Sequence, residues 1–473
     1  MPNRKKVILY NPQAVFFDMP LALLALGSVL DEKKYEVIIV DARVEDAPLE
    51  IIKKHLSEAI CFGVTVITGA PIKDALQMSA QVKQLAPNLT VVWGGWHTSL
   101  FPKEPIQEHD FIDITVQGQG EDTFKELVEH LEREQTLENV KGITYRLEGQ
   151  PVKNPPRPIA DMNQFGRVNY DLIDVEKYFR KKKKRQFDYI SSIGCYFRCS
   201  FCADPFVYQR KFSAVSPEKM VEDLIYYQQK YGFEDVNFQD ETFFTYTKRI
   251  KALAEGMIKE KVEFSWAGTM RADQGERLPD DVWKLCKEAG LRRLLIGVES
   301  GSQEMMDWMK KDVKLTQIFY CADKCKELDI AVIFPFIVGF PNETDKSVSE
   351  TVKVVKQLRK TSRKFDTPIF YFKPYPGSQI TQDVVKNGYE LPKTTLDWGD
   401  FDYVGSSGPW VTPEKERFFE HFKFYLKLAY NNKKSSLLYP LKKLSQWRCE
   451  KNQFRFPLEK YIIEKIKPAP KLS

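Results

Sequence analysis

The sequence has no apolar run long enough to cross a bilayer. Its longest apolar stretches, Leu21 to Leu30 and Ile330 to Phe340, are far shorter than the roughly 20 residues that a spanning helix needs. The N-terminal segment MPNRKKVILYNP leads from a short basic stretch into a strand, without the apolar region and cleavage site of a signal peptide. We therefore expect a cytoplasmic protein without a transmembrane helix.

Glycine and proline are too scarce for a fibrous or low-complexity protein. The chain has 24 Gly and 27 Pro in 473 residues, against 43% hydrophobic and 13% aromatic residues. This composition predicts a globular protein, and the length is sufficient for two or three domains, each with its own core.

An excess of charge of one sign is absent from most of the chain. The formal net charge is +6, but residues 411–473 contain 15 Lys or Arg against 6 Glu and no Asp. This C-terminal extension is also aromatic, with helical spacing in 418–426. We interpret it as a solvated helical cap, with contact to an anionic membrane surface as the alternative; we expect no nucleic-acid partner.

Strand-like and helix-like segments alternate twice along the chain, which predicts an α/β protein. Residues 1–140 contain five predicted strands of a doubly wound parallel sheet, and 141–185 form a linker with a short hairpin, a Pro-rich stretch and the basic run RKKKKR. Residues 186–410 contain six strands, the first five each followed by a helix. Six such units predict a partial (β/α)6 barrel with its site at the carboxyl ends of the strands.

Three of the eight cysteines form a cluster. Cys195, Cys199 and Cys202 have the spacing C-x3-C-x2-C directly after the first predicted barrel strand. Structural zinc usually has four N or S ligands, and this segment supplies three. An iron–sulfur cluster held by three cysteines instead leaves one iron open for a small molecule.

This segment resembles the signature of the radical S-adenosylmethionine (SAM) enzymes, in which an aromatic residue, here Phe201, precedes the last cysteine. The resemblance implies that a [4Fe-4S] cluster binds SAM and cleaves it to a 5′-deoxyadenosyl radical. It also implies an electron donor such as flavodoxin or ferredoxin. The family's SAM contacts follow the later strands, and the matching positions here are Asp240, Glu241, Arg271, Glu299, Ser300, Gly339 and Pro341.

The doubly wound domain ahead of the barrel is similar to that of the cobalamin-binding group of this family, which includes class B methylases and an anaerobic porphyrin cyclase. The segments PLALLALGSVL, GGWHT and QGQGE here are similar to recurring pieces of that group. The Asp-x-His-x-x-Gly motif that ligates cobalt in other cobalamin domains is absent, so we expect base-off cobalamin without a histidine ligand. The implied cobalamin contacts are Thr65, Thr68, Gly94, Gly95, His97, Gly118, Gly120 and Glu121.

Three functions follow from these expectations. The first is cobalamin-dependent methylation of an unactivated carbon of a small-molecule or lipid-like substrate. The second is a radical oxidative cyclisation or ring rearrangement without methyl transfer. The third is a non-catalytic protein that binds a metal or a corrinoid. The sequence assigns no catalytic residue beyond the cofactor contacts.

Overall fold

The computed structural model describes residues 4–401, 408–430 and 439–466. The chain divides into two compact units. The first contains residues up to 243, 248–266 and 374–401, and the second contains 244–247, 267–373 and the described residues from 408 onward. Among the described helices, none is both long and apolar enough to cross a membrane.

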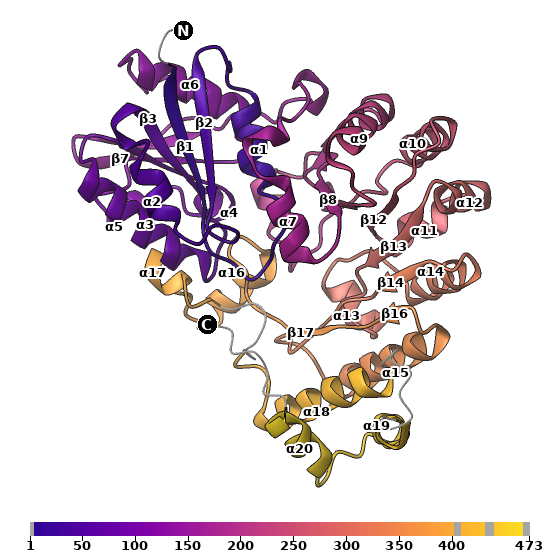
Figure 1. Ribbon diagram of the computed structural model, residues 1–473. Helices are drawn as coiled ribbons and strands as arrows, with labels where there is room; N and C mark the ends of the chain where they lie inside the picture. The colour runs from indigo at the N-terminus through magenta and orange to yellow at the C-terminus, as the bar shows by residue number, and fades with distance from the viewer. Residues whose placement is uncertain (1–3, 402–407, 431–438, 467–473) are drawn as a thin grey trace. The chain divides into compact units, whose positions relative to one another are not determined.

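A seven-stranded sheet organises the N-terminal part of the first unit (Figure 1). Its strand order is β2-β1-β3-β4-β5-β6-β7, and β1 to β5 pair in parallel as predicted. The hairpin of β6 and β7, which we expected in the linker, extends this sheet by antiparallel pairing. The strands are β1 Lys5–Asn11, β2 Tyr35–Asp41, β3 Ala59–Thr65, β4 Thr90–Gly94, β5 Ile114–Val116, β6 Ile143–Leu147 and β7 Gln150–Lys153.

Helices cover both faces of this sheet, which explains why its strands read as nearly continuous apolar runs. One core joins Ile8 and Phe62 to the α3 residue Ile72, and the other joins Leu9 to the α6 residue Phe124. On the first face lie α2 Pro48–Lys53, α3 Pro71–Leu85 and α5 Glu104–Glu108, and on the second lie α1 Leu21–Ser28 and α6 Glu121–Glu132. The short α4 Trp96–Leu100 follows β4.

The strand order places a change of direction between β1 and β3, because the chain leaves β1 towards β2 and then returns to the other side of β1. In open α/β sheets, ligands bind beyond the carboxyl ends of the strands at such a point. The loops after β1, β3, β4 and β5 are therefore the part of this sheet that is placed to hold a ligand.

The linker is more ordered than a solvated connection. It contains 3₁₀ turns at Met162–Gln164 and Tyr170–Leu172, followed by α7 Val175–Lys182. Within the basic run, Lys182 forms an ion pair with Asp188 and its side chain is only 10% exposed. Lys182 thus supplies the cation that the buried Asp188 needs, whereas most of the basic run is exposed.

The first unit also contains the beginning of the barrel. Strands β8 Gln186–Tyr189 and β11 Asp235–Phe238 pair in parallel, and β9 Ser192–Ile193 pairs with β10 Ser213–Ala214. Helix α9, Pro217–Tyr231, begins where the Ser216 side chain caps it and ends at Gly232, whose φ is +60°. The other helices of this part are α8 Asp204–Val207, α10 Thr247–Lys259, α16 Gln379–Lys386 and α17 Thr395–Trp398.

The second unit continues the alternation of strands and helices. Its strands are β12 Ser265–Met270, which begins in the first unit, β13 Leu291–Ile296, β14 Ala331–Ile333, β15 Phe336–Val338, β16 Phe365–Asp366 and β17 Ile369–Tyr371. Strand β14 pairs in parallel with β13 and β16, and β15 pairs in parallel with β17. Its helices are α11 Ala272–Arg277, α12 Asp280–Glu288, α13 Gln303–Trp308, α14 Leu315–Glu327 and α15 Asp345–Thr361.

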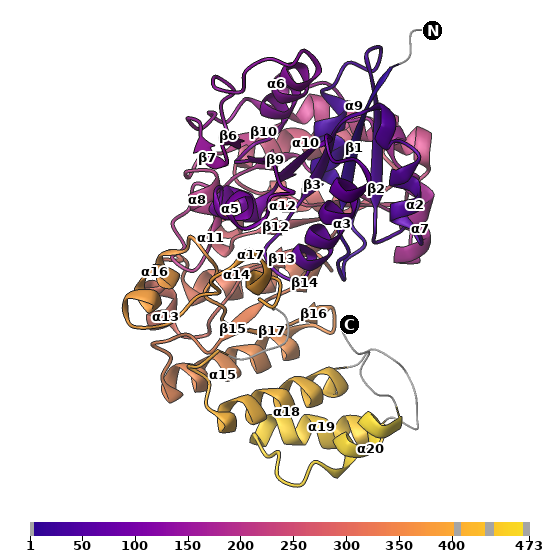
Figure 2. The same cartoon turned by 90° about the vertical axis from the view of Figure 1, so that its left-hand side faces the viewer.

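The C-terminal extension is helical, as predicted. Figure 2 shows α18 Pro413–Ala429, α19 Tyr439–Lys451 and α20 Leu458–Ile466 packed against one another. The predicted apolar stripe of α18 is buried at Phe419, Phe422 and Tyr425.

Candidate active site

The cysteine loop follows β9, and its two sides lie close to each other. Gly194 opens it with a φ of +77°, and a Cβ at this position would lie 2.2 Å from the Lys211 carbonyl oxygen. The Arg210 guanidinium donates hydrogen bonds to the Tyr196 carbonyl at 3.1 and 3.2 Å. Glycine is therefore required where the two sides of the loop approach each other.

The three clustered cysteines differ from the other five in exposure. Cys195, Cys199 and Cys202 are partly exposed, whereas the remaining cysteines are buried. Burial raises the pKa of the Cys202 thiol, and the charges of Cys199 and Cys195 raise it further. Phe201 is half-buried between the last two of them.

These thiols are not arranged around a single ion. Within the described part of the chain, no three His, Cys, Asp or Glu side chains gather closely enough to hold one metal ion. In an iron–sulfur cluster each cysteine ligates a different iron, which requires a wider spacing than the ligands of one zinc ion. The donor set, three partly exposed thiols and no histidine, therefore fits a cluster better than structural zinc.

The two acids after β11 have different environments. Asp240 is buried, and it accepts hydrogen bonds from the Ser191 backbone N–H at 2.7 Å and from the Ser192 hydroxyl at 2.7 Å. Glu241 instead lines a pocket and accepts a hydrogen bond from the backbone of Gly194, the residue before Cys195. Burial, followed by the nearby Asp204, raises the pKa of Glu241 to about 8. Of the two acids, Glu241 is the one available to a ligand.

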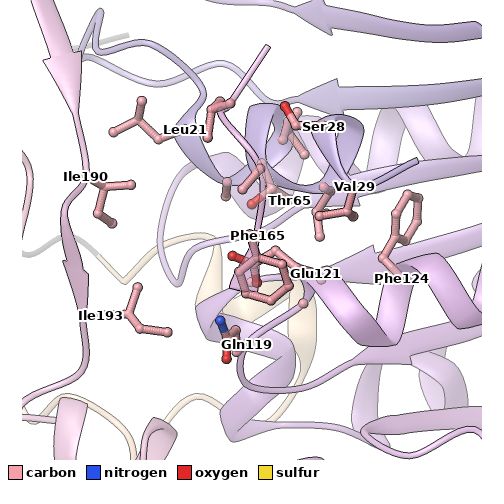
Figure 3. Close-up of a pocket in the computed structure, with 18 of the residues that line it drawn as sticks. Leu21, Ser28, Val29, Thr65, Gln119, Glu121, Phe124, Phe165, Ile190 and Ile193 are labelled. Carbon is pink, nitrogen blue, oxygen red and sulfur yellow. The ribbon is translucent and has the colours of Figure 1, made fainter. Parts of the chain in front are cut away.

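The pocket lies beyond the carboxyl ends of the N-terminal strands and has a volume of about 350 Å³ (Figure 3). One wall is formed by α1, with Leu21 at its start, and by Val29 directly after it. The opposite wall carries Ile190, which precedes β9, and Ile193, which ends it. Of the sequence-predicted cobalamin contacts, six line it: Thr65, Gly94, Gly95, Gly118, Gly120 and Glu121. All of these residues belong to the first unit.

Glycines let the backbone form the pocket floor. Gly95 has a φ of +100°, and a Cβ there would lie 2.8 Å from the Val66 carbonyl oxygen. Gly118 has a φ of +72°, and a Cβ there would meet no atom within 4 Å. Ser99 joins the two loops, since its hydroxyl donates to the Gly95 carbonyl at 2.7 Å and accepts from the Gly118 N–H at 3.0 Å. A large ligand with an apolar face and polar edges fits this lining.

Thr68 and His97 are not among the residues that line the pocket. They are buried and hydrogen-bonded to each other, with 3.2 Å between Thr68 Oγ1 and His97 Nδ1. The His97 ring packs against Phe101 and Trp398, and burial lowers the pKa of His97 to about 4. His97 is thus a neutral core residue, and none of the residues lining the pocket is a histidine.

One wall of the pocket was not predicted from the sequence. Met162, Phe165 and Gly166 line it from the segment that we interpreted as a linker, and Tyr208 lines it from the segment after the cysteines. Tyr208 contacts Trp96 edge to face at 6.1 Å between ring centroids. These residues have no local motif, although the absence of strand or helix periodicity in a long segment is typical of a functional loop.

In the second unit, Lys311 links Arg271, which follows β12, to Glu299, which follows β13. No sequence motif indicated this lysine. The Arg271 guanidinium donates to Asp273 at 2.9 Å and to the Lys311 carbonyl. The Lys311 ammonium lies 2.8 Å from Glu299 Oε1, and the two side chains are only 5% and 12% exposed. Glu299 has a φ of +64°, which is costly for a residue other than glycine.

Ser300 and Gly339 are positioned by contacts with other residues of the second unit. Ser300 is buried, and its hydroxyl lies 3.3 Å from that of Thr351. Gly339 has a φ of +85°, and a Cβ there would lie 2.3 Å from Val411 Cγ2. Its N–H donates to Glu343 at 2.7 Å, and Pro341 in the same loop is partly exposed.

Comparison with known proteins identifies both halves of the chain. The radical SAM superfamily model matches residues 189–355, and the B12 binding domain model matches residues 14–128. The barrel half is accordingly the partial barrel of the radical SAM enzymes, and the N-terminal sheet is a Rossmann-like B12-binding domain.

Individual relatives agree with this assignment. The chain is 30% identical to "Uncharacterized methyltransferase PH0819" of Pyrococcus horikoshii, over 81% of this chain and 82% of the relative. It is 26% identical to an anaerobic magnesium-protoporphyrin IX monomethyl ester cyclase of Synechocystis, over 72% of this chain and 68% of the relative. Among solved structures it is similar to the cobalamin-dependent SAM radical enzyme OxsB with aqua-cobalamin and SAM bound, with a TM-score of 0.75 and 19% identity. That match covers 99% of this chain and 74% of the other.

The chain belongs to the cobalamin-binding radical SAM enzymes. It is therefore an enzyme, and the alternative of a non-catalytic metal or corrinoid carrier was wrong.

Proposed function

We propose that this enzyme methylates an unactivated carbon of a small-molecule or lipid-like substrate. When bound, the cluster supplies the electron that cleaves SAM to a hydrogen-abstracting radical, and cobalamin supplies the methyl group, which comes from a second SAM. The observation that carries the proposal is the pocket of the first unit. Its walls combine the loops of the B12-binding sheet with Glu241, which is hydrogen-bonded to the backbone of the cysteine loop.

The chain's own residues have distinct parts in this proposal. Cys195, Cys199 and Cys202 ligate the cluster, and Phe201 shields it. Glu241 accepts a hydrogen bond from the SAM amino group, and Arg271 and Glu299 contact its carboxylate and ribose. Gly339 and Pro341 border the adenine with backbone atoms, which need no side-chain match.

Cobalamin is proposed to bind base-off along the loops after β3, β4 and β5. The absence of histidine from the residues that line the pocket supports this, as does the placement of His97 in the core beside Thr68. The apolar side of α1 and Phe165 would exclude water from the reacting carbon.

Partners follow from the chemistry. We propose that a low-potential donor such as flavodoxin or ferredoxin reduces the cluster, and that the enzyme therefore works in the reducing cytoplasm. We also propose that the basic C-terminal extension contacts a membrane surface.

Anaerobic reconstitution with iron, sulfide and hydroxocobalamin tests the proposal. After desalting, about four irons and one cobalt should remain per chain. With SAM and a reductant, the enzyme should form 5′-deoxyadenosine, and it should form S-adenosylhomocysteine only when cobalamin is bound. Retention of iron with loss of cobalt would overturn the cobalamin-dependent reaction.

Oxidative cyclisation or ring rearrangement is the second candidate, because the cyclase relative aligns with most of the chain. This chemistry would consume SAM to 5′-deoxyadenosine without S-adenosylhomocysteine. The ratio of the two products, measured on the same sample, therefore distinguishes the candidates.

A further inference from the structure

Exposed apolar side chains gather at the C-terminal end of the second unit. Twenty large hydrophobic side chains are exposed in the described part of the chain, and seven of them fall within 439–466. We call these seven the α19–α20 face: Tyr439, Leu444, Trp447, Phe456, Leu458, Tyr461 and Ile462. Single exposed apolar residues are ordinary on protein surfaces, but a concentrated set indicates an interaction site.

The spacing of these residues gives each helix an apolar outer side. On α20, Leu458, Tyr461 and Ile462 follow the pattern i, i+3, i+4, and they are 67%, 57% and 58% exposed. On α19, Tyr439 and Trp447 are eight residues apart and therefore lie on the same side, with Lys443 midway between them. Both helices thus direct apolar and cationic side chains outward.

The apolar outer side of α19 and α20 does not result from poor packing, because their inner side is well packed. Phe454 is buried and stacks on Tyr425 of α18, with 5.6 Å between ring centroids. Tyr425 donates a hydrogen bond to Glu459 of α20 at 2.9 Å, and Cys449 of α19 is buried. The exposed residues are therefore not a displaced core.

The turn between the helices is held rigidly while its tip remains exposed. Arg448 is buried, and its guanidinium donates to the Gln453 carbonyl at 3.1 Å, the Arg455 carbonyl at 3.0 Å and the Phe456 carbonyl at 3.2 Å. The Phe456 side chain is nevertheless 83% exposed. The turn therefore presents an aromatic ring to solvent on a backbone that Arg448 holds by three hydrogen bonds.

Cationic residues surround the apolar ones. Residues 439–466 contain seven Lys or Arg and three Glu. The exposed cations on or beside the face are Lys443, Lys451, Arg455 and Lys465. This combination of Trp, Tyr, Phe, Leu and Ile with lysine is typical of helices that lie in a membrane interface. Lysine is depleted in interfaces between proteins, which argues against a protein partner.

We propose that the α19–α20 face binds the surface of an anionic phospholipid bilayer, with Phe456, Tyr461 and Ile462 inserted among the headgroups and the lysines paired with lipid phosphates. The inference deepens the proposed membrane contact and rests on it, but it does not depend on the proposed methyl transfer.

Vesicle sedimentation of the full chain tests the face. Vesicles of phosphatidylcholine in which about a third of the lipid is phosphatidylglycerol should sediment most of the protein, and vesicles of phosphatidylcholine alone should sediment much less. Combining Phe456→Ser, Tyr461→Ser and Ile462→Ser should lower the bound fraction roughly tenfold. The control variant combines Leu85→Ser and Leu147→Ser, which remove two apolar side chains, each 50% exposed, from the first unit, and it should bind like the wild type.

The outcomes separate the alternatives. Wild-type protein that remains in the supernatant with anionic vesicles would overturn the inference, and so would equal loss of binding in the face and control variants. Light scattering without vesicles tests a second copy of the chain as the occupant: a dimer that the face variant dissociates would also overturn the inference. Formation of 5′-deoxyadenosine without vesicles is measured separately, so failure of the proposed chemistry and failure of the membrane face are distinguishable.

Discussion

Lys311 Nζ lies 2.8 Å from Glu299 Oε1, in an ion pair whose side chains are only 5% and 12% exposed. The same lysine accepts a hydrogen bond at its carbonyl from Arg271. Two residues that we propose as SAM contacts are thus connected through a third residue that lies twelve positions beyond Glu299 in the sequence. Lys311 is a positioning residue in this arrangement, since it orients Glu299.

Replacing Lys311 should affect both folding and SAM binding. Lys311→Met leaves a nearly buried carboxylate without its cation, which costs about 3 kcal/mol of unfolding free energy. SAM should also bind more weakly, because Glu299 loses its orientation. The double variant Lys311→Met with Glu299→Gln should recover stability but not SAM affinity. Urea unfolding and equilibrium SAM binding, measured on Lys311→Met, Glu299→Gln and the double variant, check the coupling, and recovery of both properties in the double variant would show that Glu299 does not contact SAM.

The adjacent acids Asp240 and Glu241 should respond differently to removal of their charge. Asp240→Asn disrupts a buried acceptor of serine hydrogen bonds and should lower stability by about 2 kcal/mol. Glu241→Gln should weaken SAM binding about tenfold, or about 1.4 kcal/mol, with little loss of stability.

The raised pKa of Glu241 allows a separate test of how this acid differs from Asp240. Because burial raises the pKa of Glu241 to about 8, its ionisation opposes folding as the pH rises towards 8. The Gln variant should therefore be the more stable protein in alkaline buffer. Unchanged SAM affinity in Glu241→Gln would contradict the assignment of this acid to the SAM amino group.

Stability should fall in mild acid because of His97. Burial lowers the pKa of His97 from its ordinary value of 6.5 to about 4, so the unfolded chain binds a proton that the folded chain does not. The contribution of His97 to the free energy of unfolding is then fully present above pH 6.5 and decreases as the pH falls towards 4. At about pH 5.5 the loss from this group is about 1.4 kcal/mol.

Urea midpoints near pH 7.5 and pH 5.5 measure this dependence. His97→Gln should remove that part of the pH dependence, whereas the same change at His130, which is more exposed, should not. Cobalt should remain bound to the His97 variant, since this residue lies outside the pocket lining. Loss of cobalt from the variant would instead favour a role for His97 in holding cobalamin.

The sequence was informative where chemistry depends on local spacing and uninformative where it depends on tertiary contacts. The cysteine loop, the parallel sheet and the glycine loops each have a short pattern, and the pattern determines the local structure. Asp240 and Glu241 are neighbours with the same chemistry, and only the hydrogen bonds of Ser191 and Ser192 distinguish them. Lys311 and Phe165 were missed because their roles arise from contacts with distant segments.

The cluster should depend on the three loop cysteines alone. Replacing Cys195, Cys199 or Cys202 with Ala should abolish the visible absorbance of the reconstituted cluster and all cleavage of SAM. Cys321→Ala is the matched control, because this thiol is buried in α14 and should cost only about 1 kcal/mol of stability without loss of iron. Iron content and 5′-deoxyadenosine, measured anaerobically, check both, and cleavage that persists in the loop variants would refute the site.

The glycine floor of the pocket offers a way to remove cobalamin without disturbing the cluster. Gly118 and Gly149 share a left-handed φ, +72° and +78°, and a Cβ at either would meet no atom within 4 Å. Gly118 lines the pocket, whereas Gly149 lies in the turn between β6 and β7.

Gly118→Leu and Gly149→Leu therefore carry a similar backbone cost of about 1 kcal/mol. Only Gly118→Leu adds a side chain at the pocket, so it should lose cobalt and S-adenosylhomocysteine formation while four irons per chain remain. Equal cobalt retention in the two variants would place cobalamin elsewhere.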